Sequence, residues 1–301
     1  MTGSTELERY ETIRQRLAAG ERILIDGATG TEVERRGVPQ LENAWNGGGA
    51  LSHPDIVRDI HLDYIREGAE IVISNTFATT RHALEDAGAG DLFDDYNRRG
   101  VELAVEARDG SGRPDVLVAG GVSYWSWTER HPPLDQLRND AEQQMAVMKA
   151  AGAELLMLEM MVEIDRMTVL LDAARKTGLP VWAGLSCKPD ASGTPRLFRG
   201  DLLSDAIVAA AEGGATLINI MHTEVEHVDA CLDVVEDLWR GPVGVYAHSG
   251  AYDNGKWFFN DVISPEDYAD AARRWIARGV QVIGGCCGVR AAHVAALKEI
   301  L

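Results

Sequence analysis

Short apolar runs alternate with longer amphipathic segments along almost the whole chain. Four of these runs follow a glycine that could end a helix in the left-handed conformation, at Gly68, Gly152, Gly214 and Gly279. Their apolar character is typical of strands that are buried on both faces of a sheet. Together with four similar runs they give eight expected strands, at 23–27, 68–77, 115–123, 152–160, 180–187, 214–221, 242–249 and 279–288.

Several of the intervening segments have the spacing of amphipathic helices. Apolar residues recur on one face within 54–67, 162–176 and 265–278. Pro54 and Pro265 suit a first helical turn, and a serine at position 264 suits the N-cap before it.

Eight strands alternating with helices predict a single (β/α)8 TIM barrel rather than a doubly wound sheet. The glycine-rich turn after the first strand, GATGTEVERRG, lacks the GxGxxG spacing of a dinucleotide-binding fold. No linker divides the chain, so one domain over 1–301 is expected, with 1–19 as an N-terminal helical extension.

Charge and cysteine content narrow the range of partners. The net charge of −18 disfavours nucleic acid and anionic membranes as partners, because like charges repel. The N-terminus has no secretory signal pattern, and no apolar run is long enough for a membrane span. Two of the four cysteines are adjacent, which is atypical of a disulfide framework. A reduced, cytoplasmic protein is therefore expected.

In a TIM barrel the carboxyl ends of the strands build the active site. The candidate substrate-binding residues at these ends are Asp26, Gly27, Thr29, Asn75, Glu159, Asn219 and Ser249. Asp26 and Glu159 stand out because each adjoins a buried apolar run, where a charge must be paired or functional. Helix capping is the alternative for Asp26. An ammonium group on a substrate would satisfy both carboxylates.

The segment GGCCG places Cys286 and Cys287 at the end of the last strand. Flanking glycines relax the backbone, so both sulfurs can turn toward one centre. Two thiolates supply half of a tetrahedral zinc site. A pair of small buried side chains and a redox-active vicinal disulfide are the alternatives. The remaining cysteines, Cys187 and Cys231, are expected to pack in the core.

An aromatic loop at 124–133 should lie over the mouth of the barrel. It either covers a ligand or packs between neighbouring loops, and the sequence leaves both open. Four tryptophans, Trp45, Trp125, Trp127 and Trp257, have the chemistry to face a cation with their rings.

Taken in order, these motifs resemble the homocysteine S-methyltransferase family, which includes the betaine- and S-methylmethionine-dependent enzymes. The resemblance covers roughly 20–301 and is carried by LIDGATGTEVERRG, HPDIVRDIHLDYIREGAEIVISNTF, LEMMVEIDRM, SGTPRLFRGDLLSDAI, VYAHSGAYDNGKW and IGGCCGVRAAHVAAL. It implies a zinc ion held by three cysteines, with the substrate thiol as fourth ligand. Cys286 and Cys287 match two of these cysteines, and Asp26 and Glu159 match positions that hold the amino-acid end of homocysteine.

The chain departs from the family pattern at Ile220, where the third zinc cysteine is expected. His222, two residues on and therefore on the same face of a strand, is the preferred substitute. His248, at a position that is usually asparagine in the family, is the alternative, and loss of the metal is a third reading.

The resemblance implies a methyltransferase that uses a metal-bound thiolate. A methyl group would pass from a small sulfonium or quaternary ammonium donor to a thiol, most simply homocysteine, giving methionine. A family member acting on another acceptor, or a non-catalytic protein that binds a thiol or amino acid, is the alternative. The expected partners are the small-molecule thiol and the donor, and self-association into a homo-oligomer is also compatible with the fold.

Overall fold

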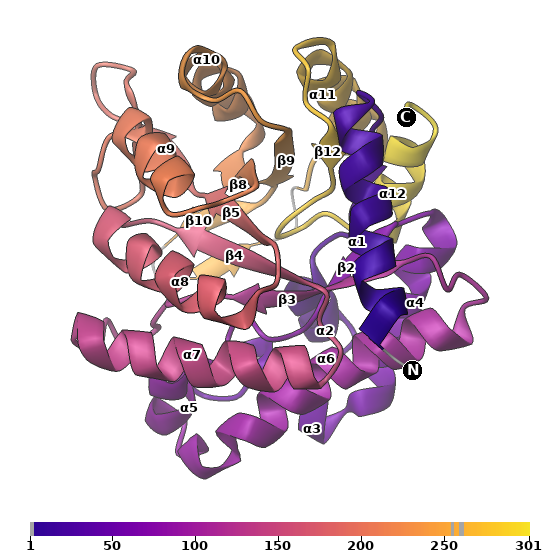
Figure 1. Ribbon diagram of the computed structural model, residues 1–301, viewed down its shortest axis with the longest axis vertical. Helices are drawn as coiled ribbons and strands as arrows, with labels where there is room; N and C mark the ends of the chain where they lie inside the picture. Colours follow the sequence, from indigo (N-terminus) through magenta and orange to yellow (C-terminus); the bar gives the residue numbers. More distant parts are fainter. Residues whose placement is uncertain (1–2, 254–255, 259–261) are drawn as a thin grey trace.

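Eight parallel strands form a closed barrel in the computed structural model, which describes residues 3–253, 256–258 and 262–301 (Figure 1). The strands, in their order around the barrel, are β1 (Ile23–Leu24), β12 (Val282–Ile283), β9 (Val243–His248), β8 (Leu217–Glu224), β5 (Val181–Leu185), β4 (Leu155–Met161), β3 (Leu117–Val122) and β2 (Ile71–Ile73). A parallel bridge between Ile25 and Ile71 joins the first and last strands of this order. The predicted TIM barrel is confirmed.

Helices surround the barrel, as Figure 1 shows. They are α2 (Thr29–Arg35), α3 (Gly49–Ser52), α4 (Pro54–Glu67), α5 (Arg81–Asp86), α6 (Phe93–Gly110), α7 (Leu134–Ala150), α8 (Ile164–Thr177), α9 (Leu203–Glu212), α10 (Val228–Leu238), α11 (Pro265–Ala277) and α12 (Ala291–Lys298), with short 3-10 turns at Asn46–Gly48, Gly90–Leu92 and Val225–His227.

The local signals read from the sequence are present in these helices. The helices predicted at 54–67, 162–176 and 265–278 correspond to α4, α8 and α11. The Ser264 side chain caps α11 by accepting a hydrogen bond from the Asp267 N–H. The four glycines expected before strands all have positive φ, between 87° and 113°.

Side chains of the strands pack into two separate layers. One lies inside the barrel and includes Trp182, Met221 and Tyr246. The other lies between the strands and the surrounding helices. Cys187 and Cys231 belong to this second layer and are only 1% exposed, which confirms that they pack in the core.

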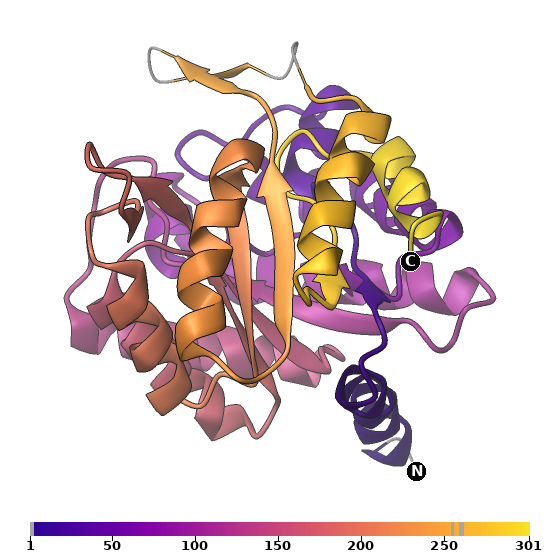
Figure 2. The same cartoon turned by 90° about the horizontal axis from the view of Figure 1, so that it is seen from above.

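The two ends of the barrel differ, and Figure 2 separates them. The helix α1 (Gly3–Ala18) lies at the end where the strands begin, and its Tyr10 hydroxyl accepts a hydrogen bond from Trp182 Nε1 at 3.3 Å. Two hairpins belong to the opposite end, β6 (Cys187–Pro189) with β7 (Pro195–Leu197), and β10 (Ala251–Asp253) with β11 (Lys256–Phe258). Within the described ranges, no helix has the length and apolar character needed to cross a membrane.

Candidate active site

Three side chains with metal-binding atoms meet at the carboxyl end of the barrel. His222 Nδ1 lies 3.3 Å from Cys286 Sγ, and the Cys286 and Cys287 sulfurs are 4.0 Å apart. The ligand atoms of all three residues lie within 4.8 Å of one another. Tetrahedral zinc with two sulfur ligands and one nitrogen would require separations of about 3.5–3.8 Å. The donor set fits zinc, and three protein ligands leave a fourth position for a substrate.

An irregularity in β8 brings His222 to this cluster. The pairing of β8 with β9 shifts register between Met221 and Glu224, and His222 has a left-handed backbone with φ 42°. Ile220 packs in the layer beneath the helices, whereas Met221 packs inside the barrel. The expectation that His222 shares a face with Ile220 is therefore wrong, and the bulge, rather than simple alternation, directs the imidazole toward the cysteines.

The cysteine pair is held by the neighbouring strand β9. The Cys286 N–H donates to the Ala247 carbonyl, and the Ser249 N–H donates to the Cys287 carbonyl, both at 2.9 Å. The preceding Gly284 cannot be enlarged, because a Cβ there would lie 2.2 Å from Ile25 Cγ1. The glycines of GGCCG thus allow the close packing that presents both sulfurs.

The pKa values of the two thiols are shifted in opposite directions. The Cys286 thiol donates a hydrogen bond to Cys287, which, together with a hydrogen bond from His222, lowers the pKa of Cys287. The same hydrogen bond and burial raise the pKa of Cys286. A thiolate at Cys287 is the protonation state suited to metal ligation.

His248 packs directly on His222 without joining the cluster of three. Their ring centroids are 4.4 Å apart with a tilt of 32°. Burial, and then the neighbouring His222, lower the pKa of His248 to about 3, so its ring is neutral, and a hydrogen bond links that ring to the His222 backbone. Among the described residues, His222 rather than His248 completes the group whose ligand atoms converge.

Asp26 follows β1 and Glu159 lies in β4, and the two carboxyl groups are close enough to interact electrostatically. Asp26 is 1% exposed, and its Oδ2 accepts a hydrogen bond from the Ile73 N–H at 2.8 Å. Burial and the charge of Glu159 raise the pKa of Asp26 well above its ordinary value. Burial, and then the Cys287 thiolate, raise the pKa of Glu159 to about 8. A cation bound between the two carboxyl groups would favour their charged forms.

A second irregular strand end orients Glu159. The pairing of β4 with β5 shifts register between Leu158 and Met161, and Met160 has a left-handed backbone with φ 53°. The Glu159 carboxylate passes so close to Gly121 that a Cβ there would lie 2.7 Å from Oε2. Sequence patterns do not reveal this bulge, because no glycine marks it.

The other predicted substrate-binding residues have more varied positions. Thr29 begins α2, two residues after Gly27, where an added Cβ would lie only 2.6 Å from the Val289 carbonyl oxygen. The Asn75 side chain donates to the Asn46 carbonyl at 3.1 Å. The Ser249 hydroxyl accepts from the Ile263 N–H at 2.8 Å.

Asn219 lies deeper than a residue at a strand end. It is fully buried and is paired in register with Gly244, near the start of β9. Its side chain contacts Met157 Sδ at 3.5 Å, inside the barrel. It therefore lies below the cysteine cluster rather than beside it.

Three aromatic residues in the loops that follow β1, β2 and β3 pack against one another. Ring centroids of Trp45, Phe77 and Trp127 are 6.1–6.5 Å apart, and Phe77 is nearly perpendicular to both tryptophans. Phe77 and Cys286 both pack against the inner layer of the barrel. Phe77 was not among the rings expected from the sequence to face a cation. Its position at the end of a predicted strand could have indicated it.

The aromatic loop at 124–133 is held by charged contacts. Arg130 pairs with Glu85 at 2.5 Å and with Asp86 at 2.7 Å. Trp125 has the Arg199 guanidinium 5.8 Å from its ring centroid. The Trp257 side chain lies outside the described residues.

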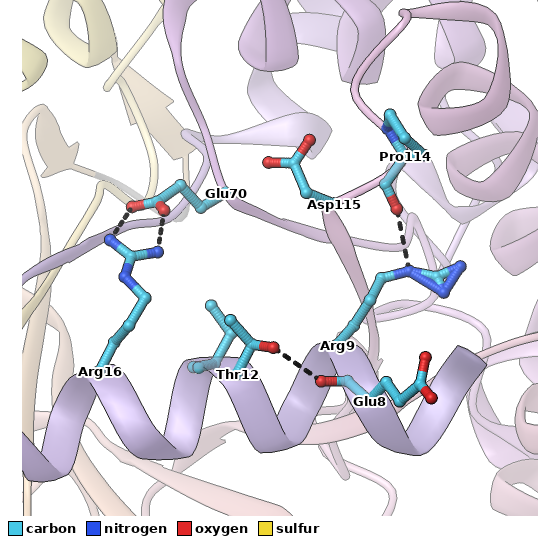
Figure 3. A pocket seen from close by; sticks show the side chains of 8 residues that line it. Glu8, Arg9, Thr12, Arg16, Glu70, Pro114 and Asp115 are labelled. Carbon is cyan, nitrogen blue, oxygen red and sulfur yellow. Dashed lines mark hydrogen bonds and ion pairs between the residues drawn. The ribbon is translucent and has the colours of Figure 1, made fainter. Parts of the chain in front are cut away.

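A hollow of about 420 Å³ lies at the other end of the barrel, beside α1 (Figure 3). It is lined by Glu8, Arg9, Thr12, Ile13, Arg16, Glu70, Pro114 and Asp115. Arg16 forms an ion pair with Glu70, and Asp115 pairs with Arg113 at 2.7 Å. These charges satisfy one another, and in a TIM barrel this end contributes to stability rather than chemistry. The cysteine cluster is therefore the better candidate site.

Fold and site together define a TIM-barrel protein that gathers soft metal ligands and buried carboxyl groups at its catalytic end. The sequence model of homocysteine S-methyltransferases matches residues 23–301. The chain therefore belongs to the homocysteine S-methyltransferase family, whose members are methyltransferase enzymes.

Individual relatives are distant but similar over nearly their full lengths. Homocysteine S-methyltransferase YbgG of Bacillus subtilis is 26% identical, covering 90% of this chain and 92% of the relative. Selenocysteine Se-methyltransferase of Brassica oleracea is 24% identical, covering 100% and 95%. The metallated homocysteine methyltransferase MmuM of Escherichia coli is 24% identical and superposes with a TM-score of 0.80, covering 96% and 99%, which supports the fold.

Proposed function

We propose that the protein transfers a methyl group from a small sulfonium or quaternary ammonium donor to the thiol of homocysteine, giving methionine. The observation that carries the proposal is the convergence of His222, Cys286 and Cys287 near the acidic pair Asp26 and Glu159. A soft-metal cluster suits a thiol, and a pair of carboxylates suits an ammonium group. An amino acid with a side-chain thiol has both.

We further propose that His222, Cys286 and Cys287 hold one zinc ion. Zinc bound there would supply Lewis acidity, lowering the pKa of a coordinated substrate thiol. In the transfer, a bond forms between the acceptor sulfur and the methyl carbon while the bond from that carbon to the donor breaks. The donor keeps the bonding pair and leaves as a neutral thioether or amine, and the thiol proton goes to solvent.

The chain's own residues would bind and orient the reactants. Asp26 and Glu159 hold the acceptor ammonium, which places the thiol at the cysteine cluster. Fixing two reactants in this way removes much of the entropic barrier to their encounter. The buried position of Asp26 strengthens its interaction with a cation, because few waters compete.

The rings of Trp45, Phe77 and Trp127 supply an attractive surface for the donor. The face of an aromatic ring attracts a cation, and methylated sulfonium and ammonium groups are bound in this way. All three rings are half-buried, so they also screen the donor methyl from water. This arrangement favours the first of the two roles considered for the 124–133 loop, covering a ligand.

A selenol is the second candidate acceptor. One similar relative is a selenocysteine Se-methyltransferase, and the cluster of two sulfurs and one imidazole is equally suited to selenium. We also propose that the protein works in a reducing compartment such as the cytoplasm, which would keep Cys286 and Cys287 as thiols.

Metal content and turnover, measured on the same preparations, test the proposal. Protein purified without added zinc should contain about one zinc per chain. It should methylate homocysteine with one of S-methylmethionine, S-adenosylmethionine, betaine or dimethylsulfoniopropionate, assayed separately. His222→Ala and Cys286→Ala should lose both properties, whereas His131→Ala, at an exposed position, should keep both.

The acceptor assignment has its own matched control. Glu159→Gln should raise the KM for homocysteine about 10- to 100-fold, because a charge-assisted contact is lost. The KM for 4-mercaptobutanoate, which lacks the ammonium group, should change little. Trp127→Leu should raise the KM of the cationic donor alone. Full turnover by zinc-free protein, or no turnover with any donor, would contradict the proposed function.

A further inference from the structure

We propose that His248 is a positioning residue that fixes the imidazole of His222 for metal binding. The inference rests on the proposed zinc site, and it assigns to His248 a role distinct from ligation. Two contacts carry it: the ring stack at 4.4 Å and the hydrogen bond between the His248 ring and the His222 backbone.

The His222 backbone needs support of this kind. A left-handed φ of 42° is uncommon for a residue other than glycine and persists only where surrounding contacts hold it. The register shift in β8 lies between Met221 and Glu224, and Glu224 pairs with His248, so His248 is the β9 residue at the far end of this irregularity.

The stacked ring also restricts how the His222 imidazole turns. The His248 ring is tilted by 32° from the His222 ring and covers one face of it. The Phe198 ring also packs against His222, at an interplanar angle of 65° and with centroids 5.9 Å apart. With these two rings packed against it, His222 has its Nδ1 3.3 Å from Cys286 Sγ. Contacts outside the metal's own ligands commonly fix the orientation of a metal-binding imidazole.

His248 also connects His222 to the cysteine strand. It lies on β9, between β8, which carries His222, and β12, which leads to the cysteine pair. The residue before it, Ala247, accepts the hydrogen bond from the Cys286 N–H. One strand thus sets the positions of the nitrogen and sulfur ligands relative to each other.

Three substitutions separate the two contacts. His248→Phe keeps a ring to stack but loses the hydrogen bond, and His248→Asn, the family-typical residue, keeps hydrogen-bonding capacity without a ring. His248→Ala lacks both. Zinc affinity is measured by competition with a chelator, and ligand geometry by the absorption spectrum of the Co²⁺-substituted protein. His131→Ala is the matched control at an exposed histidine.

We expect His248→Ala to weaken zinc binding about 10- to 100-fold, as loss of an outer contact typically does. Its Co²⁺ absorption bands should shift, and His248→Phe should lose less affinity than His248→Ala. Thermal unfolding of the metal-free variants distinguishes a variant that fails to fold from one that folds but no longer positions the His222 imidazole. If His248→Ala and His248→Phe fold and bind zinc like wild type while His222→Ala does not, the positioning role is overturned. If His222→Ala also binds normally, the proposed zinc site itself fails.

Discussion

His61 is a residue whose environment makes stability depend on pH. It lies in α4, is fully buried, and neither ring nitrogen has a hydrogen-bond partner among the described residues. Burial lowers its pKa from 6.5 to about 4. The unfolded chain therefore takes up a proton below pH 6.5 while the folded protein does not, and stability is lost as pH falls from about 6.5 toward 4.

We predict that His61→Leu removes this acid sensitivity. Between pH 7.5 and pH 5 the wild-type free energy of unfolding should fall by about 2 kcal/mol more than that of the variant, at 1.36 kcal/mol per pKa unit. Urea unfolding at the two pH values measures the difference. The exposed His131→Leu should keep the wild-type dependence. Equal pH dependence in His61→Leu and wild type would refute the prediction.

At the scale of elements, the regular parts of the barrel were predictable and its irregular ends were not. Helices α4, α8 and α11 follow from apolar spacing and from Pro54, Ser264 and Pro265, which are local signals. The bulges in β4 and β8 carry no local signal, because their left-handed residues are Met160 and His222. Tertiary contacts hold these conformations, and one sequence does not show them.

The same limit applies to the candidate site. The strand-end rule found Asp26, Glu159 and the cysteine pair because these residues directly follow apolar runs. It also placed Asn219 at the mouth, whereas the structure places it inside the barrel. The stack of His248 on His222 and the contact of Phe77 with Trp127 join residues from different strands and loops, and no spacing within one segment encodes them.

The direction of Ile220 gives a prediction about β8. In His222→Ala, adding Ile220→Cys would restore the family's third cysteine in sequence, but position 220 faces the helix layer. We therefore expect the double variant to bind no more zinc than His222→Ala alone. Shortening a fully buried isoleucine should also cost roughly 1–3 kcal/mol of stability, because a cavity remains. Zinc titration and urea unfolding measure the two effects. Recovery of a zinc-bound state in the double variant would show that β8 changes register.

At the scale of the molecule, chemistry and stability are divided between the two ends of the barrel. The proposed metal ligands lie where strands end. Figure 2 shows α1 at the other end of the barrel, where the strands begin. Ile13 and Leu17 of α1 pack against the inner layer of the barrel, and Arg9 pairs with the buried Glu154 at 3.0 Å. The helix α1 thus covers the apolar interior of the barrel at the end where the strands begin.

This division predicts the effect of deleting residues 1–19. Uncovering the contacts of Ile13 and Leu17 should cost roughly 1.5–3 kcal/mol for each side chain, and lost hydrogen bonds of Tyr10 add about 1 kcal/mol each. The Tm should fall by on the order of 10 °C. Below the transition, zinc affinity should be unchanged, because no α1 residue with a described side chain belongs to the cluster of His222, Cys286 and Cys287. Calorimetry and zinc titration test both parts, with Arg14→Ala on the exposed face of α1 as the control. An unchanged Tm would show that α1 does not stabilise the barrel, and a loss of zinc from the folded truncated protein would show that the two ends are coupled.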